Sequence, residues 1–221
     1  MESKMYKKHR EKLFSLFDEN QNGVVFIQGS DILYRNETDY EYPFRQESNF
    51  WYLTGVNEPE CALVLDLKTE EYHLFVPKRD AQYAVWHGYV KSLETYQQQY
   101  NPDHLHYGNE ILTVLNEIKP EKVYCLTEND AEFIEDLDRG FDADVEALQD
   151  ALTYCRVLKT EAELEYMRKA AKVNDLAHAE VMKAIKPGMY EYELKAIFTK
   201  IQYEHGLQLD AYNGIFAGGK N

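Results

Sequence analysis

Two histidines separated by one residue are the first side chains whose types could hold a metal ion. His104 and His106 would lie on the same side of a strand, because side chains alternate between its two faces, and Asp103 could add a carboxylate. The local sequence favours another interpretation, a solvent-facing histidine pair in a loop after Pro102. The spacing raises the hypothesis of a metal site without identifying its other ligands.

No catalytic motif is present elsewhere in the sequence. It contains no H-E-x-x-H, C-x-x-C, G-x-S-x-G, P-loop or G-x-G-x-x-G pattern. His178 is interpreted as a packed or capping histidine of a helix, because no second ligand type follows it at position i+4. Spacing alone therefore identifies no catalytic residue and no metal ligand.

Aromatic residues are concentrated in the segment 42–55, YPFRQESNFWYLTG. The segment is expected to be a strand whose rings fill a core, with Arg45 paired to a neighbouring carboxylate. Trp86 stands beside the turn residues His87 and Gly88. It is either a core side chain, which the local sequence favours, or an exposed anchor for a ligand or partner.

The elements that must position these side chains predict an α/β domain over residues 1–155. Amphipathic helices are expected at residues 5–18, 111–118, 130–137 and 145–154. Strands are expected at residues 24–27, 50–54, 61–67, 72–76 and 123–126. Helices that alternate with strands indicate layered α/β architecture.

Residues 156–221 have a different pattern. Thr160 and Glu163 form a capping box that opens a long helix ending before Pro187, and a second helix is expected from about Tyr190. Residues 212–217 resemble a strand that enters a glycine turn. Two helices and one strand cannot enclose a core, so we expect this second domain to be incomplete.

Composition narrows the class of protein. The 39 acidic and 24 basic residues give a formal charge of −15, which would repel nucleic acid. The three cysteines, Cys61, Cys125 and Cys155, indicate neither a disulfide framework nor a thiolate zinc site. No apolar run approaches the roughly 20 residues that cross a bilayer, so a cytoplasmic protein without membrane contact is expected.

Several segments in order resemble the family of prolidases and aminopeptidases P. The resemblance is carried by residues 44–48, 50–55, 58–59, 74–77, 86–88, 155–160, 163–168, 177–178, 186–194, 212–215 and 218–221. It implies a creatinase/aminopeptidase P-type N-terminal domain, with a mixed sheet flanked by helices, over residues 1–155. Residues 156–221 would then be the truncated start of an α+β pita-bread metallopeptidase domain.

The resemblance also implies a reaction. Members of the family hydrolyse the peptide bond before proline, using two divalent ions, typically Mn²⁺, that activate a water molecule and polarise the scissile carbonyl. Proline has no N–H and its ring fixes the backbone, so general proteases handle this bond poorly. The family's metal ligands follow the part of the family sequence that this chain resembles, so this chain alone is expected to be inactive.

Two residues match positions that bind substrate in the family. Trp86 matches a tryptophan that reaches across a homodimer to line the partner protomer's pocket, and Tyr212 matches a tyrosine beside the metals. The segments 44–48 and 155–160 are closer to prolidases, the Xaa-Pro dipeptidases. An Xaa-Pro aminopeptidase acting on longer peptides and a non-catalytic binding or dimerisation module remain the alternatives.

Overall fold

The computed structural model describes residues 2–18, 21–137 and 140–219. The chain divides into two compact units, residues 1–158 and 159–221. The domain boundary expected at 155/156 falls inside the last helix of the first unit, Ala147–Val157, and it stays a prediction.

The first unit is built on a mixed six-stranded sheet. Its strands are β1 Gly23–Gln28, β2 Ala62–Asp66, β3 Tyr72–Val76, β4 His104–Tyr107, β5 Lys122–Cys125 and β6 Ala143–Asp144. Their order in the sheet is β4-β3-β2-β1-β5-β6. β2 runs antiparallel to both of its neighbours, and the other pairs are parallel.

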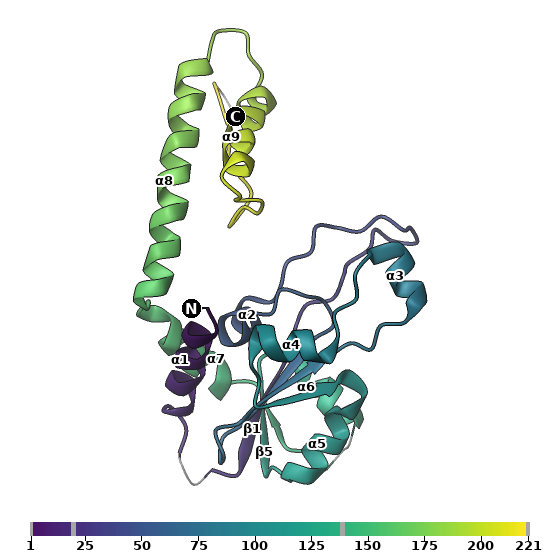
Figure 1. The fold of residues 1–221 in the computed structure, drawn as a ribbon. Helices are drawn as coiled ribbons and strands as arrows, with labels where there is room; N and C mark the ends of the chain where they lie inside the picture. Colours follow the sequence, from purple (N-terminus) through teal and green to yellow (C-terminus); the bar gives the residue numbers. More distant parts are fainter. Residues whose placement is uncertain (1, 19–20, 138–139, 220–221) are drawn as a thin grey trace. The chain divides into compact units, whose positions relative to one another are not determined.

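Helices cover both faces of this sheet. They are α1 Glu2–Phe14, α2 Ser48–Thr54, α3 Ala81–His87, α4 Leu93–Tyr100, α5 Ile111–Ile118, α6 Glu128–Leu137 and α7 Ala147–Val157, with a 3-10 turn, η1, at Gly108–Glu110. α1 and α7 lie on one side of the sheet and α5 and α6 on the other (Figure 1). The predicted α/β fold with a mixed sheet is confirmed.

Side chains alternate between the two faces of the sheet along each buried strand, and those on each face contribute to a separate hydrophobic core. In β1, Val25 and Ile27 join the core beneath α1 and α7, whereas Val24 and Phe26 join the core beneath α5 and α6. All four side chains are fully buried, as expected for a central strand covered on both faces. The predicted strands at 24–27, 61–67, 72–76 and 123–126 are confirmed, each within a few residues of its expected ends.

The strand predicted at 50–54 is wrong, because these residues form helix α2. The Glu47 carboxylate accepts a hydrogen bond from the Phe50 backbone N–H at 2.6 Å and caps the first turn. Gly55, in the left-handed conformation, ends the helix by donating its N–H to the carbonyl of Trp51. Caps at both ends outweigh the strand preference of the aromatic residues between them.

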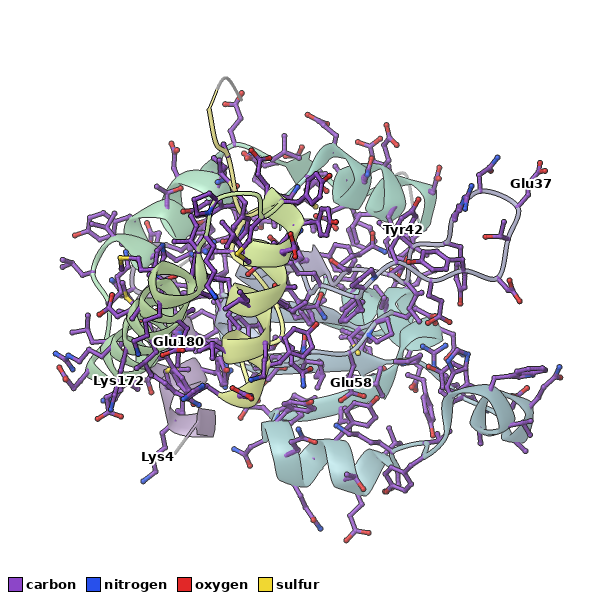
Figure 2. All side chains as sticks on the ribbon, turned by 90° about the horizontal axis from the view of Figure 1, so that it is seen from above. Lys4, Glu37, Tyr42, Glu58, Lys172 and Glu180 are labelled. Carbon is purple, nitrogen blue, oxygen red and sulfur yellow. The ribbon has the colours of Figure 1, made fainter. Side chains whose placement is uncertain are left out.

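The expectation that segment 42–55 fills a core holds only in part. Phe50 and Tyr52 are buried, but Trp51 is half exposed on the outer side of α2. Tyr42, also half exposed, lies toward the base of a long excursion that follows β1, and Glu37 lies at its outer end (Figure 2).

The second unit contains helix α8, Glu161–Ala184, and helix α9, Glu191–Glu204. The predicted capping box is confirmed: the Thr160 hydroxyl and the Glu163 carboxylate cap each other's backbone N–H groups. The strand predicted at 212–217 is wrong, since these residues form no regular element. A strand requires a hydrogen-bonded neighbour, and none is found for this segment in the part of the chain that the structure describes.

Candidate functional site

Trp86 lies on the outer surface of helix α3, where it is 79% exposed. Val85 and Tyr89 beside it in sequence are also largely exposed. The interpretation of Trp86 as a core side chain is therefore wrong. A large aromatic side chain exposed next to two further apolar ones is typical of a binding surface rather than of packing.

The helix that carries Trp86 belongs to an excursion, residues 79–91, between β3 and α4. The Asp80 carboxylate caps α3 by accepting from the Tyr83 N–H at 2.8 Å. At the start of the excursion Arg79 donates to the Glu60 carboxylate at 2.7 Å, and its guanidinium lies 4.2 Å from the centre of the Tyr83 ring. These contacts fix the orientation of α3 relative to the loop that carries Glu60.

Glu58 holds the other end of the excursion. Its carboxylate accepts hydrogen bonds from Lys91 at 2.6 Å, from Tyr96 at 2.6 Å and from Tyr100 at 2.8 Å. Burial raises the pKa of Glu58, but the hydrogen bonds from Lys91 and the two tyrosines outweigh it, so the net pKa is lowered. Glu58 and Glu60 flank Pro59, so one short loop anchors both ends of residues 79–91.

The residues before α2 brace the same loop. The buried Gln46 side chain accepts from the Ser30 N–H at 2.6 Å and donates to the Glu58 carbonyl at 2.8 Å. Glu47, next in the chain, caps α2. The motif at residues 44–48 therefore has a structural role in the first unit, ordering the connections from which the Trp86-bearing excursion projects.

Tyr212 lies in the second unit, in the segment after α9, and is 79% exposed. The segment is held to α9 on both sides of Tyr212. Asp210 accepts from Gln202 at 2.8 Å, and the Gly218 N–H donates to Glu191 at 2.7 Å. The Tyr212 hydroxyl is thus presented on an ordered loop, and its role beside metals stays a prediction.

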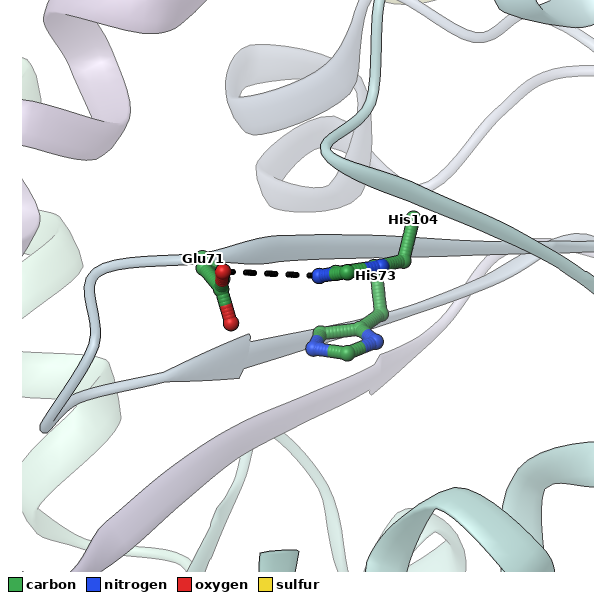
Figure 3. Close-up of side chains that lie close together, drawn as sticks. All are labelled: Glu71, His73 and His104. Atoms are coloured by element: carbon green, nitrogen blue, oxygen red, sulfur yellow. Dashed lines mark ion pairs between the residues drawn. The ribbon is translucent and has the colours of Figure 1, made fainter.

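His104 and His106 lie in strand β4, so the alternative that placed them in a loop is wrong. Asp103 does not join them, because its carboxylate accepts the Tyr72 N–H at 2.9 Å. The side chains that lie close to His104 are His73, in the neighbouring strand β3, and Glu71, just before that strand (Figure 3). Neither residue was predicted from the sequence, although the pattern Glu71-x-His73 leading into an expected strand is the signal that could have identified them.

The predicted role of His178 is confirmed in part. Its ring Nδ1 lies 2.9 Å from the carbonyl oxygen of Asn174, one helical turn earlier, and its ring contacts Phe198 edge to face. The side chain is exposed rather than buried. It acts as a local contact between α8 and α9.

Comparison with known sequences places both units in one kind of protein. The family model "Aminopeptidase P, N-terminal domain" matches residues 6–124, more than half of the chain, and "Metallopeptidase family M24" matches residues 165–221. The chain belongs to the aminopeptidase P and M24 metallopeptidase family and contains its N-terminal domain with the start of the M24 domain.

Curated relatives carry two different activities in their names. The Xaa-Pro dipeptidases of Pongo abelii and Homo sapiens are 38% and 37% identical over 206 residues, which cover 90% of this chain and 42% of each relative. A probable Xaa-Pro aminopeptidase of Verticillium alfalfae is 32% identical over 205 residues, covering 90% of this chain and 44% of that protein. The chain spans less than half the length of these relatives.

Solved structures show the same fold. Zinc-substituted E. coli aminopeptidase P in complex with product has a TM-score of 0.86 at 23% identity, covering 96% of this chain and 51% of that chain. Pseudomonas aeruginosa aminopeptidase PepP has a TM-score of 0.83 at 25% identity, covering 92% of this chain and 49% of that chain.

Among the described helices, none is long and apolar enough to cross a membrane.

Proposed function

We propose that these residues are the front part of an Xaa-Pro dipeptidase, which hydrolyses the bond before proline in Xaa-Pro dipeptides. The observation that carries the proposal is the identity of 37–38% with Xaa-Pro dipeptidases across 206 residues that span both units. The proposed domains are residues 1–155, the aminopeptidase P-type N-terminal domain, and residues 156–221, the beginning of the M24 domain.

The two divalent ions, proposed to be Mn²⁺, would be held by M24 residues outside this chain. In the described residues the one group of histidine, cysteine or carboxylate side chains close enough to hold an ion is Glu71, His73 and His104, which lies in the first unit. The described part of the M24 segment does not fit a two-metal site. The M24 segment of this chain would contribute Tyr212 to the active site.

Trp86 and Tyr212 are proposed to bind the substrate. Trp86 would line the active-site pocket of the partner protomer in a homodimer, which its exposure and the anchoring of its helix support. Tyr212 would place a hydroxyl next to the metal ligands, where it can orient them or the substrate.

The assignment is tested by the activity of the polypeptide that contains these residues together with a whole M24 domain. We expect hydrolysis of Gly-Pro that is lost on chelation and restored by Mn²⁺, and little hydrolysis of the tripeptide Gly-Pro-Ala. Residues 1–221 alone are expected to give no turnover. Faster cleavage of the tripeptide than of the dipeptide would reject the dipeptidase assignment in favour of an Xaa-Pro aminopeptidase.

In that complete enzyme, Trp86→Ala is expected to raise KM for Gly-Pro by about tenfold, which corresponds to about 1.4 kcal/mol of lost binding. Unfolding free energy should change by less than about 0.5 kcal/mol, because the side chain is exposed. Trp51→Ala removes a tryptophan that is half exposed on α2 and is the matched control, with KM unchanged. Equal KM values for Trp86→Ala and the wild type would remove Trp86 from the site.

The second candidate is an Xaa-Pro aminopeptidase, which the name of the Verticillium relative and the fold shared with E. coli aminopeptidase P favour. A non-catalytic binding or dimerisation module is the third. The coding sequence after Asn221 distinguishes this module from both enzymes. We expect it to encode one His, two Asp and two Glu metal ligands, and their absence would favour the binding module.

A further inference from the structure

Four side chains that can hold metals, Glu71, His73, His104 and His106, lie on one face of the sheet where β3 pairs with the edge strand β4. His73 is paired directly with His104 across the two parallel strands, and Phe75 is paired with His106. Glu71 precedes His73 by two residues and therefore lies on the same face. The rings of His73 and His104 stack with their centres 4.5 Å apart, and Glu71 Oε1 lies 3.5 Å from His104 Nε2 (Figure 3).

The ring of His73 is the buried member of this cluster, with only 7% of the residue exposed. Its Nδ1 lies 3.2 Å from Nε2 of His106, whereas its own Nε2 is buried and has no hydrogen-bond partner among the described residues. His106 lies farther along the strands than His104, so Nδ1 is directed away from Glu71. Figure 3 shows the other ring nitrogen of His73 turned toward the Glu71 side.

We propose that Glu71, His73 and His104 bind one Zn²⁺ ion that links β3 to β4. Two imidazoles and one carboxylate are ligands that zinc accepts, with water in the fourth position. One ligand atom from each of the three residues already lies within 4.8 Å of the other two. Nε2 of His73, which is buried without a hydrogen-bond partner among the described residues, would be a zinc ligand.

Binding requires a modest closure of the cluster. Zinc lies about 2 Å from each nitrogen or oxygen ligand, so the ligand atoms must approach to roughly 3.3 Å from one another. His104 and Glu71 can make this movement, because their side chains are 45% and 46% exposed. His73 stays fixed in the sheet, and His104 rotates out of its stacked position above it.

His106 would act as a positioning residue. When zinc occupies Nε2 of His73, the proton of that ring is on Nδ1, which donates to Nε2 of His106 at the observed 3.2 Å. A metal-bound histidine commonly donates its second N–H in this way, which fixes its tautomer and orientation.

The plain alternative is that these histidines only pack the edge of the sheet. Packing explains the stacked rings, but it leaves a buried ring nitrogen of His73 unsatisfied, an arrangement that is uncommon in folded proteins. It also does not require Glu71 to stand beside His104. A metal ion accounts for both features and would secure β4, which pairs with β3 and with no other described strand.

The test is calorimetric titration of ZnCl₂ into the 221-residue chain, with its cysteines kept reduced and metals removed beforehand. We expect one saturable site per chain, a higher Tm with Zn²⁺, and at least tenfold weaker binding for His104→Gln and for Glu71→Gln. Both substitutions are at partly exposed positions, so the variants should fold. His205→Gln, at an exposed histidine after α9, is the matched control and should bind like the wild type.

A second readout identifies the ligands directly. Imidazole ¹⁵N resonances of His73 and His104 should shift in slow exchange on addition of Zn²⁺. His106→Ala should move the ¹⁵Nδ1 resonance of zinc-bound His73 and weaken Zn²⁺ binding, because the Nδ1–H of His73 loses its acceptor. Two results would overturn the proposal: wild-type chain that shows no saturable Zn²⁺ binding, or His104→Gln and Glu71→Gln variants that bind Zn²⁺ with wild-type affinity. These outcomes are independent of peptidase activity.

Discussion

Replacing Glu58 by alanine is expected to lower the free energy of unfolding of the first unit by about 3 kcal/mol. The substitution leaves Lys91 and the hydroxyls of Tyr96 and Tyr100 without the carboxylate that accepts all three hydrogen bonds. Both tyrosines are buried residues, so their hydroxyls would lose a partner with limited access to water. Urea denaturation followed by circular dichroism measures the loss.

The matched control is Glu60→Ala, on the other side of Pro59. Glu60 forms its ion pair with Arg79 in a more exposed position, so its loss should cost less than about 1 kcal/mol. If the two substitutions cost the same, the three hydrogen bonds to Glu58 contribute no more than an exposed ion pair.

Acid should reduce the difference in the free energy of unfolding between wild type and Glu58→Ala. The pKa of Glu58 is lowered in the folded state, because the hydrogen bonds to its charged form outweigh its burial. Its stabilisation is therefore complete above the carboxyl group's ordinary pKa of about 4.3 and is lost as the pH falls through the lower folded value. A stability difference that stays constant between pH 7 and pH 3 would contradict this account.

Gly55→Ala is expected to destabilise the first unit by about 2 to 3 kcal/mol. Gly55 has φ +73°, a conformation that alanine adopts at a cost, and an added Cβ would overlap the ring of Tyr6. Either the Tyr6 ring or the whole of α1 must then shift at the end of α2, where Arg10 donates to the Leu53 carbonyl and the His9 ring stacks on Tyr52. Thermal and urea unfolding measure the effect.

Two comparisons separate the backbone cost from the steric one. Gly188→Ala, at φ +93° with no atom within 4 Å of the added Cβ, should cost only about 1 kcal/mol in the unfolding of its own unit. In a double-mutant cycle, Gly55→Ala should be less costly when Tyr6 is already alanine. An equal cost in both backgrounds would show that the Tyr6 ring moves aside without penalty.

Local sequence determined much of the fold. The buried strand of residues 24–27 is apolar on both faces, and Thr160 with Glu163 fixes the start of α8 through contacts within four residues of one another. Signals of this range need no knowledge of distant neighbours. The same holds for the order of motifs that carries the family resemblance, which the matches at 6–124 and 165–221 confirm.

Other features depended on contacts that no local pattern contains. Segment 50–54 has the composition of a strand, but Glu47 and Gly55 cap it as a helix, and α1 and α7 provide the surface on which it packs. The strand predicted at 212–217 does not form, because a strand exists only where a neighbouring strand pairs with it, and no described strand pairs with this segment.

By itself, therefore, the sequence determined the family, the class of fold and the helices whose ends are capped locally. The tertiary structure alone decided that Trp86 is exposed on an anchored helix and that Glu71 and His73 stand beside His104. Glu71 and His73 are about thirty residues from His104 in the chain, and the parallel pairing of β3 with β4 brings them together. Exposure and proximity of this kind follow from how distant segments pack, which residue spacing does not encode.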